Sequence, residues 1–309
     1  MAEGRLIPHH SEAIVLRTWP FHEADLLVSI FTRDHGKVKG VARHAMKSRK
    51  RFGGALEPAT HVRAHYTERP PQDLVRLDQF EILWSPLTAP IDTLRLAALQ
   101  LVTEVLEQAM PDQAADDNIY RLALTVLTSL NSNSGPSRNS GNSSAPSSAT
   151  APSSPNVGSQ NPGCPIHDDS SIVGMGGEAQ TLEAQTPAPA QTPQIYLPIT
   201  YFCLWMNRLM GWMPALGHCA ACGLDLRNQT VYWSPTADGV TCHDDRRPQS
   251  RTLSAASVAE SHRIARTPLA DLLLEPWPPN RSADLRIFAI ANLERHLERR
   301  LRSATALLL

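Results

Sequence analysis

The chain has 309 residues and a formal net charge of -1, and it is long enough for two domains with separate hydrophobic cores. Its apolar residues never form the roughly 20-residue run that a membrane span needs, and residues 1–6 lack the apolar core of a signal peptide. The five cysteines are odd in number, which argues against a disulfide framework. We therefore expect a cytoplasmic protein.

Residues 12–85 are predicted to form β-structure. Gly36 follows Asp34 and His35 and can supply the positive φ of a tight hairpin between two apolar runs. The predicted strands cover residues 13–16, 26–31, 37–42, 60–66 and 74–84. Short strands in this close succession favour a small closed barrel, because closure removes exposed sheet edges.

The third predicted strand begins a run of positive charge, residues 37–51, which we call the basic tract. It contains no carboxylate. Its cations are Lys37, Lys39, Arg43, Lys47, Arg49, Lys50 and Arg51. Such a cluster attracts polyanions whatever the net charge of the chain, so we predict that it binds the phosphate backbone of DNA. The alternative is a solvated face that has no ligand.

Helical periodicity follows the strands. Apolar residues recur at three-to-four spacing over residues 94–109, 119–130 and 199–210. A last helix is predicted from Ser282 through Leu301, with basic residues near its end that suit the helix dipole. These apolar stripes are interpreted as core.

A polar segment, residues 131–193, separates the two pairs of predicted helices. It is dominated by Ser, Asn, Pro, Gly, Ala and Thr and contains no aromatic residue, so we predict a disordered linker. The expected divisions are a DNA-binding barrel (1–86), the first helices of a helical domain (87–130), the linker (131–193) and the remaining helical domain with a cysteine-rich knuckle (194–309).

The strongest metal motif is Cys219-x-x-Cys222 followed by a glycine, with Cys242 at the spacing of a second zinc knuckle. Asp245 stands where a fourth cysteine is expected. A closed, structural Zn²⁺ site made by Cys219, Cys222, Cys242 and Asp245 is the prediction, with His243 or His218 as alternative fourth ligands. In the other interpretation the knuckle has lost its metal and survives through packing of Val231, Tyr232, Trp233 and Val240.

Motifs for catalysis are missing from the sequence. There is no GxxxxGK[ST] phosphate loop, no GxSxG elbow and no HExxH pair. A two-metal nuclease would need a tight group of carboxylates, and the basic tract has none. We therefore predict a protein that is not an enzyme, with a nuclease as the rival that a cleavage assay would reveal.

Several segments resemble one known family. They are Ala13-Ile-Val-Leu-Arg17, Glu23-Ala-Asp25, Phe31-Thr-Arg-Asp-His-Gly36, Gly40-Val-Ala-Arg43, Ser48-Arg-Lys-Arg-Phe-Gly53, Leu56-Glu-Pro58, Leu209-Met-Gly-Trp-Met-Pro214, Trp233-Ser-Pro235 and Leu297-Glu-Arg-Arg-Leu-Arg-Ser303. Together they resemble the bacterial RecO recombination-repair family at both ends of the chain. The resemblance implies an α+β fold: an N-terminal OB-fold β-barrel followed by an α-helical domain, which bears a zinc knuckle in some members.

The resemblance also implies a function and partners. The family binds single- and double-stranded DNA, anneals complementary strands and, with RecR and in some settings RecF, helps load RecA onto strands coated by single-strand-binding protein (SSB). This implies a nucleoid-associated protein. The acidic SSB C-terminal tail is expected in an apolar pocket of the helical domain, with Arg208, Arg121 and Arg299 as candidate rim residues.

Phe52 is a candidate for base stacking or for barrel core. The rival function is a zinc-ribbon scaffold or regulator that acts mainly through protein contacts.

Overall fold

A computed structural model describes residues 6–48, 50–70, 73–88, 92–132 and 194–308. Arg49 of the basic tract and residues 133–193 of the predicted linker lie outside these ranges. The first two residues of the predicted linker belong to a helix, because α2 (Asp117–Ser132) extends to Ser132.

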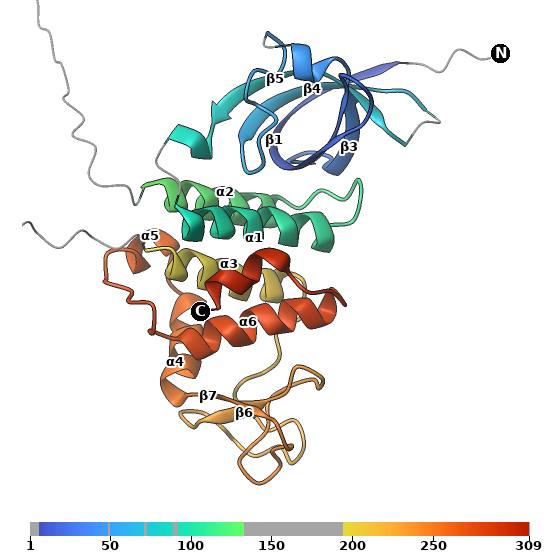
Figure 1. Cartoon of the computed structure of the whole chain (residues 1–309). Helices are drawn as coiled ribbons and strands as arrows, with labels where there is room; N and C mark the ends of the chain where they lie inside the picture. Colours follow the sequence, from blue (N-terminus) through green and yellow to red (C-terminus); the bar gives the residue numbers. More distant parts are fainter. Residues whose placement is uncertain (1–5, 49, 71–72, 89–91, 133–193, 309) are drawn as a thin grey trace, which may run out of the picture. The chain divides into compact units, whose positions relative to one another are not determined.

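The N-terminal part is a five-stranded, OB-fold-like sheet (Figure 1). Its strands are β1 (Ile7–Pro20), β2 (Leu26–Thr32), β3 (Gly36–Ala42), β4 (His61–Glu68) and β5 (Val75–Trp84). They are hydrogen-bonded in the order β1-β2-β3-β5-β4, and β4 pairs back with β1, so the pairings return to their start as in a closed barrel. The parallel contact between β3 and β5 is short and joins residues 40–42 to residues 75–77.

Strands β1 and β2 bury both of their faces. Side chains alternate along a strand, so Val15 and Ile30 lie in the core of the five-stranded sheet while their neighbours Ile14 and Phe31 lie in the core formed with the helices. All four side chains are fully buried. A strand with two buried faces gives a continuous apolar run in sequence rather than a clean alternation.

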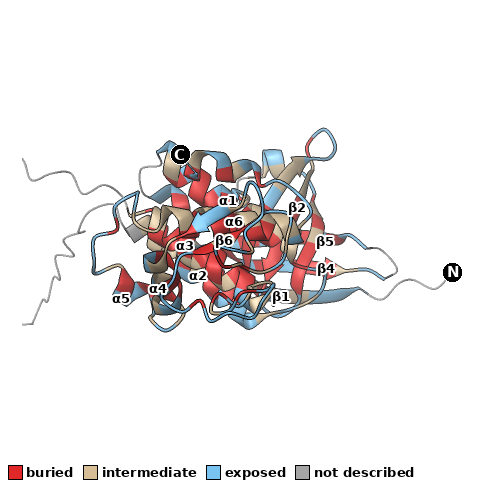
Figure 2. Ribbon diagram, turned by 90° about the horizontal axis from the view of Figure 1, so that it is seen from below, coloured by how far each residue is buried: buried red, intermediate tan, exposed pale blue. Residues whose placement is uncertain are grey.

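The rest of the described chain is mainly helical. The helices are α1 (Thr93–Ala109), α2, α3 (Tyr196–Leu209), α4 (Ala255–Ile264), α5 (Leu269–Leu272) and α6 (Ala283–His296), with 3-10 turns η1 (Ala45–Lys47), η2 (Pro86–Thr88) and η3 (Arg302–Leu307). Figure 2 shows buried residues in red along α1, α2, α3 and α6. Within the described ranges, no helix is both long enough and apolar enough to cross a membrane.

The last helix is shorter than the sequence predicts. α6 ends at His296, and Glu298 has a φ of 52°, in the left-handed region that interrupts a helix. The apolar stripe nevertheless continues to Leu301, which is buried at the start of η3. Apolar spacing identified the core residues correctly, but it could not show that the backbone changes direction between them.

At Gly36 the backbone of the sheet passes close to the backbone of the connection between α1 and α2. Gly36 has a φ of 70°, and a Cβ built on it would lie 2.2 Å from the carbonyl oxygen of Ala114, in that connection. Any other residue would therefore clash with backbone as well as adopt an unfavourable conformation. The predicted hairpin glycine also serves this second purpose.

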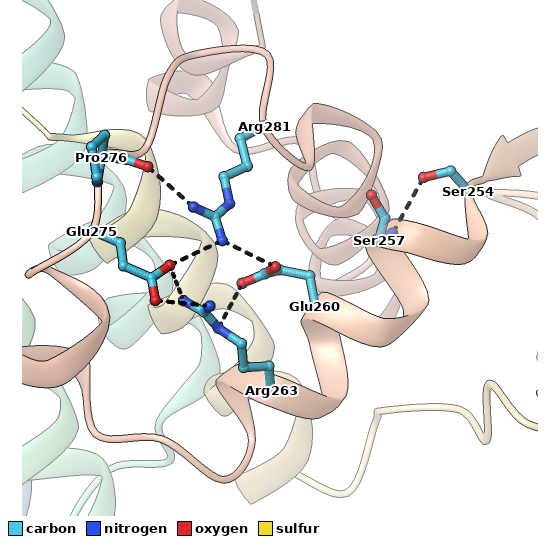
Figure 3. Close-up of polar contacts among 7 residues, drawn as sticks. All are labelled: Ser254, Ser257, Glu260, Arg263, Glu275, Pro276 and Arg281. Atoms are coloured by element: carbon cyan, nitrogen blue, oxygen red, sulfur yellow. Dashed lines mark hydrogen bonds and ion pairs between the residues drawn. The ribbon is translucent and has the colours of Figure 1, made fainter. Parts of the chain in front are cut away.

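An ion-pair network holds α4 against the segment that leads to α6 (Figure 3). Arg263 contacts Glu275 at 2.8 Å and Glu260 at 3.2 Å, and Arg281 lies 3.4 Å from each of the same two carboxylates. The hydrogen bond from Arg263 lowers the pKa of Glu275. Because Glu275 is half-exposed, we take this network as a device that positions α4 rather than as a large source of stability.

Candidate nucleic-acid interface and metal centre

The basic tract leaves β3 and passes through η1 before it reaches the core at Phe52. Arg43, Lys47 and Lys50 are exposed there. No carboxylate pairs with any of these three within the ranges that the structure describes, so their charge is available to an anion. They are the solvent-facing part of the predicted DNA contact.

The turn between β1 and β2 lies beside this part of the tract. The backbone N–H of Met46 donates to the carbonyl of Ala24 over 3.2 Å, and the N–H of His44 donates to Oδ1 of Asp25 over 2.7 Å. Phe21 belongs to the same turn, is 42% exposed, and contacts the His22 ring at a centroid distance of 4.3 Å. The turn that is bonded to the tract therefore also carries an exposed aromatic ring.

Sequence reasoning missed Phe21 because the turn and the tract are about twenty residues apart. The available signal was an aromatic pair, Phe21-His22, directly after Pro20 in a predicted turn, where a large apolar ring has no core to enter. The stacking candidate that the sequence did offer, Phe52, is only 3% exposed and packs edge-on against Phe80. Phe52 is thus a core residue.

Arg51 shapes the tract. Its Nε donates to Ser48 Oγ over 3.2 Å and its Nη2 donates to the carbonyl of Arg43 over 2.5 Å. Its guanidinium also lies over the Phe52 ring, 5.2 Å from the centroid. These contacts tie the two ends of the segment together, so Arg51 positions Arg43 as well as adding charge.

Lys37 and Lys39 have a different environment from the rest of the tract. Lys37 is buried, and its Nζ donates to the carbonyl of Glu107 over 2.9 Å and lies 3.3 Å from Asp112. Lys39 lies 4.0 Å from the Glu107 carboxylate and 3.9 Å from Asp112. Ser29 completes the contact by donating to Glu107 over 2.5 Å. Both lysines are therefore occupied in joining β3 to the end of α1.

The second candidate site is the cysteine knuckle, residues 217–253. Its first turn is closed by two backbone hydrogen bonds, one between Cys219 N–H and the carbonyl of Leu224 and one between Gly223 N–H and the carbonyl of Cys219, both 2.9 Å long. Gly223 has a φ of 77°, which the turn requires and which glycine adopts freely. The turn holds Cys219 and Cys222 on one side, as the Cys-x-x-Cys spacing predicts.

Four predicted ligands meet in the knuckle. The ligand atoms of Cys219, Cys222, Cys242 and Asp245 all lie within 4.8 Å of one another. Asp245 Oδ2 is 3.3 Å from the Cys219 sulfur and 3.2 Å from the Cys242 sulfur, and the sulfurs of Cys222 and Cys242 are 3.9 Å apart. The alternative fourth ligands, His243 and His218, are not part of this cluster: His243 Nδ1 lies 3.3 Å from Asp244, and the backbone of His218 pairs with that of Asp225.

These distances fit a tetrahedral ion. Zinc–sulfur bonds of about 2.3 Å place two sulfurs about 3.8 Å apart, and a zinc–oxygen bond of about 2.0 Å brings sulfur and oxygen to about 3.5 Å. The observed contacts lie close to both values. Three thiolates and one carboxylate are also donors that zinc accepts, so the residues are compatible with a closed site.

The thiols and the carboxylate affect one another's protonation. Hydrogen bonding to Asp245 raises the pKa of Cys222 to about 12, and the same hydrogen bonds lower the pKa of Asp245. Burial opposes ionisation of Cys219, but backbone N–H groups, foremost that of Cys222, outweigh it and lower the Cys219 pKa. The hydrogen bonds between Cys222 and Asp245 therefore favour the charged carboxylate and the neutral Cys222 thiol, and a metal bound here would have to displace the Cys222 proton.

A cavity of about 180 Å³ lies between α3 and α4. Leu204, Leu216 and Ile264 contribute apolar wall, and the exposed Arg208 lines it beside Trp205. The Arg208 guanidinium lies 5.5 Å from the Trp205 ring centroid. Of the three predicted rim arginines, only Arg208 lines this cavity; the exposed Arg121 and Arg299 do not.

Comparison with known proteins matches the N-terminal and the C-terminal part of the chain to the same family. Residues 6–86 match the family model described as recombination protein O N terminal, and residues 187–305 match recombination protein O C terminal. The DNA repair protein RecO of Koribacter versatilis is 39% identical over 297 residues, which cover 96% of this chain and 97% of that protein.

More distant relatives agree with this match. RecO of Syntrophotalea carbinolica is 25% identical over 84% of this chain and 78% of its own length, and RecO of Anaeromyxobacter sp. (strain K) is 27% identical over 93% and 91%. The two family models fall on the five-stranded sheet and on the helical part with its knuckle, and the Koribacter protein spans both. The chain therefore belongs to the RecO family of recombination proteins.

Proposed function

We propose that this protein is a non-catalytic mediator of recombinational DNA repair that binds single- and double-stranded DNA and anneals complementary strands. The observation that carries the proposal is the group of unpaired, exposed cations Arg43, Lys47 and Lys50 beside the exposed Phe21 ring, on an OB-fold-like sheet of a RecO-family chain. The start of the tract is held to α1 by Lys37 and Lys39, and Arg51 ties its later part together. Arg49 is proposed as a further DNA contact on the basis of sequence alone.

The proposed surface combines the two interactions that single strands need. Cations neutralise phosphates and release condensed counterions, while an aromatic ring stacks on any base because every base has a π-face. Annealing then needs no proton transfer, since screening the repulsion between two polyanionic strands is sufficient. An OB-type groove suits a flexible strand for the same reason.

The test is the salt dependence of binding by the variant Arg43→Ala/Lys47→Ala/Lys50→Ala. Each lost phosphate contact should reduce the slope of log K against log salt by about 0.7 on single strands, so the variant should lose roughly 2. The control Arg63→Ala/Arg69→Ala/Arg76→Ala removes the same charge from exposed positions on β4, β5 and the turn between them. Equal slopes for the two variants would overturn the proposal.

Partner contacts form a second part of the proposed function. We propose that the protein works in the cytoplasm at the nucleoid with RecR, and with RecF in some settings, to load RecA onto SSB-coated single strands. The cavity between α3 and α4 is the proposed site for the SSB tail, because apolar walls beside Arg208 suit an acidic peptide that ends in apolar residues. Arg208→Ala should weaken binding of that peptide, measured by anisotropy, and leave binding of free DNA unchanged.

A zinc-ribbon scaffold that acts only through protein contacts is the alternative. Annealing assays on bare and SSB-coated strands distinguish the two functions, because only a mediator anneals both.

Incubating labelled DNA with Mg²⁺ or Mn²⁺ tests the further expectation that the protein has no nuclease activity. The domain divisions at residues 86, 130 and 193 are part of the same proposal.

We propose that Cys219, Cys222, Cys242 and Asp245 hold a structural zinc ion. Asp245→Ala should lower the zinc content of the purified protein and its thermal stability, whereas Asp245→Cys should retain both because it restores a four-thiolate site. Asp244→Ala is the matched control, since the neighbouring Asp244 side chain is 93% exposed and lies outside the cluster. Equal zinc content in the Asp245→Ala and Asp244→Ala variants would remove Asp245 from the ligand set.

A further inference from the structure

The knuckle has an outer face that its metal-site residues do not use. Strand β6 (Val231–Trp233) pairs with β7 (Arg251–Leu253), and Tyr232 lies opposite Thr252. Tyr232 also exchanges backbone hydrogen bonds of 3.0 Å and 2.7 Å with Thr241. Because neighbours along a strand face opposite sides, Tyr232 points away from the buried Val231 and Trp233.

The half-buried Tyr232 ring has two partners on that outer face. The guanidinium carbon of Arg246 lies 5.6 Å from its centroid, and the His243 ring meets it edge-on at a centroid distance of 5.8 Å. An aromatic ring beside a guanidinium plane is the kind of surface on which an unpaired base stacks.

Two exposed arginines belong to this side: Arg246, which contacts Tyr232, and Arg247, which is next to it in the chain. The exposed Arg251 pairs with Trp233 across the strands and lies over its ring at 5.7 Å, so it is on the opposite face from Tyr232. Throughout the described ranges, none of the three forms an ion pair with a carboxylate. Their charge is therefore uncompensated, as in the exposed part of the basic tract.

The acidic groups of the knuckle are largely engaged. Asp245 belongs to the ligand cluster, Asp225 pairs with Arg227 at 2.5 Å, and Asp238 pairs with Arg295 of α6. Asp244 lies 3.3 Å from His243, and its side chain, like that of Asp238, is mostly exposed. The outer face thus keeps an excess of positive charge beside an aromatic ring.

We propose that this face is a second binding site for single-stranded DNA, with Arg246 and Arg247 on phosphates and Tyr232 stacked on a base. It is separate from the surface proposed on the five-stranded sheet, and it gives each chain a place for a second strand. Two strands held by one protein meet at a high effective concentration, which favours pairing.

The metal site would support this surface from its inner side. Cys242 and Asp245, both in the ligand cluster, directly precede His243 and Arg246, which flank Tyr232. Holding the two ligands in place therefore also holds the two side chains that flank the ring. In this arrangement the knuckle is a rigid platform for a strand.

The experiment counts short oligothymidylates bound per full-length, zinc-containing chain by native mass spectrometry. Wild type should bind up to two copies, and Arg246→Ala/Arg247→Ala should bind one. The control Arg69→Ala/Arg266→Ala removes the same charge from exposed positions outside the knuckle and should bind two. If the knuckle variant loses zinc, Arg247→Ala replaces it, because Arg247 does not adjoin a ligand.

A knuckle variant that binds as many copies as the control, with the same salt dependence, would overturn the inference. The Tyr232→Leu variant tests the stacking contact. It should bind the second oligonucleotide more weakly, with an unchanged dependence of that affinity on salt, whereas Tyr232→Phe should keep the wild-type affinity. The variant Arg43→Ala/Lys47→Ala/Lys50→Ala separates the two sites. If it still binds two copies while the knuckle variant binds one, the function proposed for the sheet fails and the knuckle site stands.

Discussion

Phe21 and the cations beside it should contribute to DNA binding in different ways. Phosphate contacts depend on salt because they release counterions, whereas stacking of a base on a ring is nearly independent of salt. Lysine and arginine variants should therefore change the slope of affinity against salt, and a Phe21 variant should change the affinity at every salt concentration. This difference lets each residue be assigned to one interaction.

We expect Phe21→Ala to weaken single-strand binding by about 1–3 kcal/mol, or roughly 5- to 150-fold, with an unchanged salt slope. Phe21→Trp should retain affinity. Fluorescence anisotropy with a labelled oligonucleotide at several salt concentrations measures both quantities. A Phe21→Ala protein with wild-type affinity would show that the exposed ring does not stack on bases.

Some site residues could be predicted from the sequence and others could not. The Cys-x-x-Cys spacing and the later position of Cys242 predicted three of the four clustered residues, because a metal site would fix this spacing. Asp245 followed from its position in the same pattern. The sequence shows the charges of Lys37 and Lys39 but not their partners, because Glu107 and Asp112 come from α1 and the segment after it.

At the scale of elements, Glu104 on α1 holds the last turn of the chain. Its carboxylate accepts hydrogen bonds from the backbone N–H groups of Arg302 and Ser303, at 3.0 Å each, and from Ser303 Oγ at 2.5 Å. Burial alone would raise the Glu104 pKa, but these hydrogen bonds outweigh it and lower the pKa below the ordinary value of 4.5. The ionised carboxylate therefore caps the start of η3.

This shift gives a pH dependence with a definite sign. A carboxyl group whose pKa is lower in the folded state contributes its full stability above its unfolded pKa and loses it as pH falls through the folded pKa. Glu104→Gln should thus lower the melting temperature at pH 7, by about 2–4 °C for each kcal/mol lost, and the difference from wild type should shrink in acid below pH 4.5. Glu57→Gln, at an exposed position, is the control. A constant difference across pH would contradict the role assigned to the charge.

The five strands of the sheet and the helices α1, α2, α3 and α6 followed from sequence patterns, but their ends did not, and α4, α5 and the β6–β7 pair were not predicted. β1 begins at Ile7, six residues before the predicted apolar run, because His9 and His10 pair with Tyr66 and His65 of β4 although they are polar. α6 ends early, at His296, because the backbone at Glu298 adopts a left-handed φ. Both differences arise where a tertiary contact or a single torsion angle decides the structure, and neither leaves a periodic signal in sequence.

At the scale of the whole molecule, the sheet and the helices share one core. Ile14, Leu16 and Phe31 of β1 and β2 belong to the same buried cluster as the helical residues. Cutting the chain after the sheet would expose these side chains to water, at a cost of about 1.5–3 kcal/mol for each large apolar residue. Although the sheet has its own interior cluster, the helices complete its outer surface.

We therefore expect the fragment 1–86 to be much less stable than the same residues in the full chain. Chemical unfolding followed by circular dichroism should show a lower midpoint for the fragment, and calorimetry of the full chain should show the described parts unfolding together. Replacing Leu16 and Phe31 with Ser in the fragment should recover solubility but not stability. Independent unfolding of the sheet at full stability would contradict a shared core.

The contact between Gly36 and Ala114 has a mechanical consequence. A side-chain contact yields by rotating about its torsions, whereas here backbone meets backbone, and Lys37 next to it is bonded to the Glu107 carbonyl. If the turn between β1 and β2 binds DNA as we propose, a strand that pulls on it would transmit its tension to α1 through this contact and the neighbouring Lys37 bond. A force on a bound strand would then be passed rigidly from the sheet to the helices and to any partner that the helices bind.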